Sequence, residues 1–149
     1  MKALVLTQPW ATLVAIGAKQ FETRSWDTSY RGTLAICAGK GIPAELGGER
    51  GHRERIETEP FKTALRPERS PCPRGGVIAV VELVETFRCE GDPPPGAPWQ
   101  EEHFGNFSAG RFMWELRHPR PIALVPVRGH QKIFNLPPDV TQNVLAAIA

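Results

Sequence analysis

The sequence predicts an α+β fold, a small barrel-like sheet of about six strands with flanking helices. Two observations predict it. Short apolar runs of strand length recur along the chain, the longest over residues 76–87, and several alternate in polarity with a period of two. Apolar residues spaced three and four apart predict one helix over residues 7–17 and another from residue 138. At 149 residues, the chain fits a single domain, residues 1–149.

The chain opens with a predicted strand and helix. Residues 2–6 are mostly apolar, which is typical of a short buried strand. In the helix that follows, Thr7 can cap the first turn, and Pro9 lies where a missing N–H does no harm. Gly17 can adopt the positive φ that ends a helix.

After this helix the period changes to two, which predicts a strand over residues 20–25. The alternation turns Phe21 toward a core, while Glu22 and Arg24 face the other way. Lys19 lies at the corner between helix and strand and adds a third charge.

The charged corner has two interpretations. Three charges in a tight turn are usually a solvated surface feature. Trp10 and Trp26 flank the corner, however, and an apolar helix precedes it, so Lys19, Glu22 and Arg24 could instead lie in a partly desolvated hollow. The residues alone favour the two interpretations equally.

The middle of the chain departs from this regular pattern. A turn over residues 26–32 leads to an apolar strand over 33–37. A polar insertion follows at about 43–75, in which Gly and Pro interrupt two weak helical patterns. Its basic run, residues 50–55, is more typical of a solvated surface than of a phosphate site.

The strand predicted over residues 76–87 carries an acidic side chain, Glu82, between Val80 and Val84 on one face. Leaving that carboxylate buried without a partner would cost several kcal/mol, so we expect it either to pair or to open onto a cleft. The candidate partners are Lys19, Arg24 and Arg31. An ion pair that only closes the barrel is an equal alternative.

The last third begins with a Pro/Gly-rich loop at about 90–110, which predicts either disorder or a functional lid. Three short strands are then predicted over 111–116, 124–128 and 133–136, before the final helix.

Composition excludes several classes of protein. The formal net charge of +2 is too small for a non-specific polyanion binder, although basic runs at 50–55 and 111–132 could form a local patch. Three cysteines without a C-x-x-C pair argue against a disulfide framework and a zinc site, and we expect no metal or cofactor. The N-terminal apolar run is too short for a signal peptide or a membrane span, so we expect a soluble cytoplasmic protein with no membrane partner.

Gly17, Lys19, Glu22 and Arg24 form the pattern G-x-K-x-x-E-x-R, which resembles the signature of the ASCH (activating signal cointegrator homology) domains, a branch of the PUA-like superfamily. Further matches are Q-P-W-A at 8–11, Y-R-G at 30–32, the strand at 76–83, W-E-L at 114–116 and R-G at 128–129. The likeness spans most of the chain apart from 43–75 and 90–105. It implies a PUA-like β-barrel.

The resemblance also implies a cleft that recognises RNA or a nucleotide, either single-stranded nucleic acid or a modified nucleoside, between the first helix and the barrel. Lys19 and Arg24 would contact phosphate, and Gln8 and Glu22 would bind a base edge. One of the two tryptophans would stack on the base. The candidate nucleic-acid-binding residues are Gln8, Trp10, Lys19, Arg24, Trp26, Arg31 and Lys40.

A small hydrolase is the alternative. Some ASCH-like bacterial proteins are amidohydrolases acting on an acylated cytidine, and related proteins are ribonucleases. The candidate catalytic residues are Lys19 as general base or electrophile, Glu82 to orient it, and Glu22 to activate water. Glu22 stands where the amidohydrolases have threonine, so their mechanism does not transfer directly.

Overall fold

The computed structural model describes residues 1–66 and 72–149, and its strands form one mixed sheet with the order β2-β5-β4-β3-β1-β6. The elements are β1 (Lys2–Leu6), α1 (Trp10–Ala15), β2 (Phe21–Arg24), β3 (Gly32–Ala38), the 3₁₀ turn η1 (Ala44–Leu46), α2 (Gly48–Ile56), α3 (Phe61–Leu65), β4 (Gly76–Arg88), α4 (Glu101–Phe104), β5 (Phe112–Pro126), β6 (Phe134–Asn135) and α5 (Pro138–Ile148). The predicted α+β class and the six strands are confirmed for the described part of the chain.

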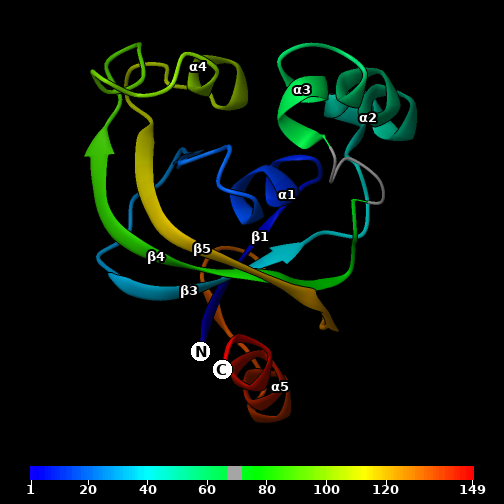
Figure 1. The fold of residues 1–149 in the computed structure, drawn as a ribbon. Coiled ribbons are helices and arrows are strands. Elements are labelled where there is room, and N and C mark those ends of the chain that lie inside the picture. Colours follow the sequence, from blue (N-terminus) through cyan, green and yellow to red (C-terminus); the bar gives the residue numbers. More distant parts are fainter. Residues whose placement is uncertain (67–71) are drawn as a thin grey trace.

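The sheet is open, which corrects the expectation of a barrel. Its edge strands β2 and β6 have four and two residues, and all their described pairing is with β5 and β1. The long strands β4 and β5 curl strongly instead (Figure 1). A side chain, not a ladder of main-chain bonds, reaches between β2 and β1: Arg24 Nη2 donates to the Val5 carbonyl at 2.8 Å.

Strand β5 is continuous, whereas the sequence predicted two separate strands, because Pro119 and Pro121 resemble breaks. β2 pairs with β5 only from Phe112 to Glu115, so beyond that point β5 has a free edge where proline displaces no ladder bond. Register shifts against β4 absorb the irregularity, and His118 has a φ of 54°.

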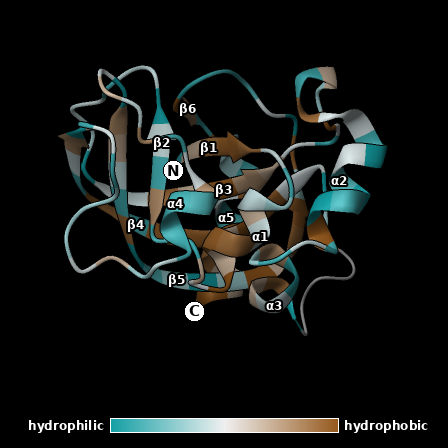
Figure 2. Cartoon of the chain, turned by 90° about the horizontal axis from the view of Figure 1, so that it is seen from above, coloured by the Kyte–Doolittle hydropathy of each residue, from teal (hydrophilic) through white to brown (hydrophobic). Residues whose placement is uncertain are grey.

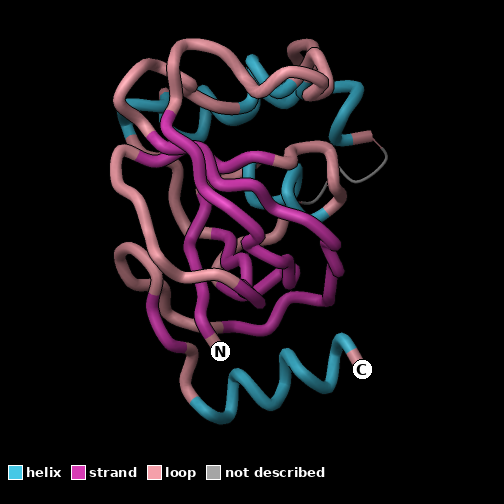
Figure 3. The backbone as a smooth tube through the Cα atoms, turned by 90° about the vertical axis from the view of Figure 1, so that its left-hand side faces the viewer, coloured by secondary structure: helices cyan, strands magenta, loops and turns pink. Residues whose placement is uncertain are grey.

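Two apolar layers hold the sheet. α1 covers one face, where Leu4, Ile36 and Val81 are at most 1% exposed. α5 covers the other through Val140 and Val144, which pack with the alternate residues of β1, β3 and β4. Figures 1 and 3 show α5 on the opposite side of the sheet from the other helices. The period-two pattern therefore supplies a core on both faces.

The two irregular segments lie on the α1 side. The polar insertion contains η1, α2 and α3, and Figure 2 shows α2 as largely hydrophilic; the insertion's residues 67–71 lie outside the described part. The Pro/Gly-rich loop contains the short helix α4, which the sequence did not predict. Its Phe104 and Phe107 are 2% and 4% exposed, so this loop has apolar anchors of its own.

We expect Gly76→Ala to lower the free energy of unfolding by about 1–3 kcal/mol or more. A Cβ at Gly76 would lie 2.3 Å from the Val125 carbonyl oxygen, which is main chain of the neighbouring strand and cannot turn aside. Gly41→Ala is the matched control, because its Cβ would meet nothing within 4 Å. Urea unfolding measures both variants, and equal stabilities would contradict this account of the β4–β5 contact.

Candidate nucleic-acid interface

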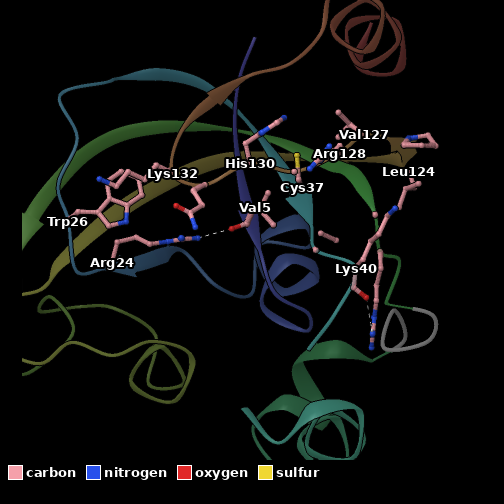
Figure 4. Close-up of a pocket in the computed structure, with 17 residues that line it drawn as sticks. Val5, Arg24, Trp26, Cys37, Lys40, Leu124, Val127, Arg128, His130 and Lys132 are labelled. Atoms are coloured by element: carbon pink, nitrogen blue, oxygen red, sulfur yellow. Dashed lines mark hydrogen bonds between the residues drawn. The ribbon is translucent and has the colours of Figure 1, made fainter. Parts of the chain in front are cut away.

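A cleft of about 1430 Å³ opens where β1, the end of β3 and the end of β5 meet (Figure 4). Of the 17 residues that line it, none is Asp or Glu. Its positively charged lining residues are Arg24, Lys40, Arg74, Arg128 and Lys132. A concave surface lined by a single sign of charge focuses the field and attracts anions.

These five cations differ in how far they are neutralised. Arg74 binds Glu49 at 2.6 Å, and the Lys132 ammonium lies 5.5 Å from the centre of the Trp26 ring. Lys40 and Arg128 are exposed and have no ion pair within the described residues. Lys40 and Arg128 therefore leave positive charge in the cleft that no carboxylate of the described residues neutralises.

Arg24 is the most firmly held of the five. As the last residue of β2, it directs its guanidinium between Glu22, whose Oε2 accepts from Nε at 2.9 Å, and the carbonyl of Val5. Its side chain keeps 24% exposure. The guanidinium therefore forms a rigid wall of the cleft that still presents surface to a ligand.

Lys19 lies deeper than the sequence predicted, with a side chain only 1% exposed. Its ammonium donates to the carbonyls of Phe21 at 2.5 Å and Phe104 at 2.9 Å, and lies 3.5 Å from Glu22 Oε1. Burial lowers the pKa of Lys19, and the negative charges of Glu22 and Glu101 offset part of this decrease. All three N–H donors thus have partners inside the protein, and a role toward a ligand stays a prediction.

Glu101 of α4 lies beside this lysine and is fully buried. Its Oε2 accepts the N–H of Gln20 at 2.7 Å, while Oε1 is buried without a hydrogen-bond partner among the described residues. Burial raises the pKa of this carboxyl, and the charge of Lys19 only partly opposes the rise. The loop is further tied by Thr23 Oγ1, which accepts the N–H of Asn106 at 3.0 Å.

The structure places Gln8 and Trp10 outside the basic cleft. Gln8 is buried: its Oε1 accepts the N–H of Thr12 at 3.0 Å, and its Nε2 donates to the Pro73 carbonyl at 2.7 Å. It therefore holds the first turn of α1 in place. Trp10 is half-buried and lies under the guanidinium of Arg55, 4.9 Å from its ring centre. Of the two candidate tryptophans, Trp26 alone lines the basic cleft.

Glu82 and Arg31 have other partners than the sequence suggested. Glu82 accepts a hydrogen bond from Thr33 Oγ1 at 2.9 Å, its neighbour in the β3–β4 ladder. Arg31 binds Glu85 at 2.6 Å on the surface. The structure therefore brings Lys19, Glu22 and Arg24 together but bonds Glu82 elsewhere, because the strand register places it opposite Thr33.

Sequence reasoning did not single out several residues of the cleft: Arg74, Arg128, His130, Gln131 and Lys132. A signal for part of this set was present, since the basic run 111–132 and the R-G pair at 128–129 were both visible. Arg74 had none, because it follows the polar insertion and reaches the cleft only through the fold.

The described residues also bear on metal and thiol chemistry. They contain no group of three His, Cys, Asp or Glu side chains placed to hold a metal ion. Cys37 lines the cleft, but burial raises the pKa of its thiol to about 12, so it is protonated at neutral pH.

Among the described residues, no helix combines the length and apolarity needed to cross a bilayer.

The curved mixed sheet, the helix α1 and the Lys19–Glu22–Arg24 corner define a class of protein. The family model of the ASCH domain matches residues 4–125, and the chain belongs to this family.

Two curated relatives are similar along most of the chain. They are activating signal cointegrator 1 of mouse and of human, each 26% identical over 93% of this chain. The chain spans 23% of the length of each relative. Among solved structures, the ASCH protein of Zymomonas mobilis is 14% identical with a TM-score of 0.55, covering 99% of this chain and 95% of that chain. A point mutant of the same protein gives the same score. At this identity the likeness supports the fold alone.

We expect Lys19→Met to lower the free energy of unfolding by about 3 kcal/mol, because it leaves buried carbonyls unpaired and removes one of the two cations held by Glu22. Arg24 still pairs with Glu22 in this variant, which limits the loss. Lys62→Met, at an exposed lysine of α3, is the control, with an expected change within about 0.5 kcal/mol. Denaturant unfolding compares the two, and a small effect at Lys19 would show that its amine is not a structural tie.

We expect Glu101→Gln to remove part of the pH dependence of stability. Folding raises the pKa of Glu101 above its ordinary value of 4.5. The carboxyl therefore contributes most to stability at a pH below 4.5, and this contribution is lost as the pH rises through the raised pKa of the folded state. The amide keeps an acceptor for Gln20 but does not titrate. Unfolding free energies from acid to neutral pH should fall less steeply in this variant, whereas Glu102→Gln, at the exposed neighbour, should keep the wild-type slope.

Proposed function

We propose that this chain is an RNA-binding module whose basic cleft holds the phosphate and base of single-stranded RNA or of a nucleotide. The observation that carries the proposal is the lining of the cleft, with five Lys or Arg side chains and no carboxylate. Phosphate contacts supply most of the affinity of such sites.

The distribution of groups along the cleft fits a nucleotide. Lys40, Arg74 and Arg128 form a cationic part suited to phosphate. Trp26 offers an aromatic surface. Its ring and that of Trp114 pack in a T-shaped arrangement with their centres 4.8 Å apart, and the Lys132 ammonium lies over the Trp26 ring. Stacking of bases on fixed aromatic rings is the usual way to hold single-stranded RNA. Membership of the ASCH family agrees with this proposal.

Among the candidate site residues, Lys19 and Glu22 act in this proposal by positioning Arg24, and Gln8 acts by positioning α1. The hydrolase alternative requires Glu82 beside Lys19. No contact among the described residues favours that arrangement, since Glu82 bonds Thr33. We therefore propose binding and not hydrolysis.

We expect the double variant Lys40→Ala/Arg128→Ala to weaken binding of a single-stranded oligoribonucleotide and to flatten its salt dependence. Each lost phosphate contact should lower the slope of log K against log salt by about 0.7. Fluorescence anisotropy across a salt series measures both quantities.

Arg53→Ala/Lys62→Ala is the matched control, because it removes the same charge from exposed positions that do not line the cleft. Equal slopes for the two double variants would mean that the cleft is not the phosphate site. No binding by the wild-type chain would overturn the proposed function itself.

A further inference from the structure

A second cleft, of about 510 Å³, lies on the other side of Arg24 from the basic cleft. It runs between β2, the start of α1 and the loop that carries α4. Trp10, His103, Asn106 and Arg111 are among its lining residues. We call it the loop cleft.

The two clefts are adjacent, because Val5 and Arg24 line both of them. The bond from Arg24 Nη2 to the Val5 carbonyl is thus their common boundary, and Figure 4 shows Arg24 reaching toward Val5 from the side of Trp26. One tryptophan lines each cleft, Trp26 the basic cleft and Trp10 the loop cleft. An arginine between two aromatic surfaces matches a phosphate between two bases.

The charges of the loop cleft are compatible with a polyanion. Its one carboxylate, Glu22, is held by Arg24 at 2.9 Å and lies 3.5 Å from the Lys19 ammonium. Arg111 adds a positive charge, with its guanidinium fixed by the carbonyls of Asn106 and Thr23 at 3.1 and 3.3 Å. The acidic group is therefore outweighed by cations fixed around it.

We propose that the ligand is a strand of several nucleotides that occupies both clefts and passes over Arg24, and not a single nucleotide or nucleoside. This inference rests on the proposed function and specifies the substrate class of the same site. One base lies against Trp26, a second lies in the loop cleft beside Trp10, and the phosphate between them lies at Arg24. His103 and Asn106 border the path on the loop side.

Isothermal titration calorimetry with uridine monophosphate and an unlabelled uridine octanucleotide tests the proposal. The wild-type chain should bind an octanucleotide at least about tenfold more tightly than uridine monophosphate, since a single nucleotide cannot fill both clefts. His103→Glu should weaken binding of the octanucleotide by about tenfold and leave binding of uridine monophosphate, which the basic cleft holds, unchanged. Trp10→Ala should act in the same direction.

Gln142→Glu is the matched control for His103→Glu. It makes the same change of charge at an exposed position of α5, on the opposite side of the sheet, and should change neither affinity. The ring centre of Trp10 lies 6.1 Å from that of Phe61, so Trp10→Ala could disturb the packing. Its affinity is compared only if circular dichroism shows the wild-type fold. His103 is exposed, and His103→Glu tests the proposal without Trp10→Ala.

The outcomes separate the two proposals. Equal affinities of wild type for uridine monophosphate and the octanucleotide would overturn the two-cleft path and leave the basic cleft as the site. A longer strand that binds more tightly but is unaffected by His103→Glu would also overturn it. If neither the monophosphate nor the octanucleotide binds, the proposed function fails and this inference fails with it.

Discussion

The fold depends on one buried carboxylate that holds two cations. Glu22 lies 2.9 Å from Arg24 and 3.5 Å from Lys19, and these partners reach the main chain at Val5, Phe21 and Phe104. Buried charges are tolerated only when they are paired and hydrogen-bonded, and here each of the three is. The network connects β2 to β1 and to the 90–110 loop. A curved sheet whose edge strands do not pair with each other is held by side chains at this point.

This arrangement also explains why the cleft is basic. Arg24 is directed into the space between β2 and β1 because Glu22 and the Val5 carbonyl fix its two ends. Lys40 follows β3, and Arg128 and Lys132 follow β5, so the curl of the sheet brings them to the same opening. No neighbouring carboxylate lines that opening, and its positive charge is left for a ligand.

The local parts of this structure could be predicted from the sequence, and the parts that depend on register could not. The strands β1 to β4, the helix α1 and the proximity of Lys19, Glu22 and Arg24 follow from short spacings and a change of period. Glu82 was predicted to seek a basic partner, but the β3–β4 register, which no local pattern encodes, sets it opposite Thr33. Arg74 was missed because it follows the polar insertion and reaches the cleft only through the fold. Closure of the barrel was overestimated because the shortness of β2 and β6 limits their pairing.

The 90–110 loop is fastened chiefly through its main chain. Lys19 binds the carbonyl of Phe104, Thr23 accepts the N–H of Asn106, and Arg111 donates to the Asn106 carbonyl. Main-chain groups are present whatever residue occupies a position. Apart from Glu101 and the apolar anchors, the loop can therefore change its side chains without detaching from β2. Related chains could diversify ligand preference by substitution at the tip of this loop while the supporting sheet stays the same.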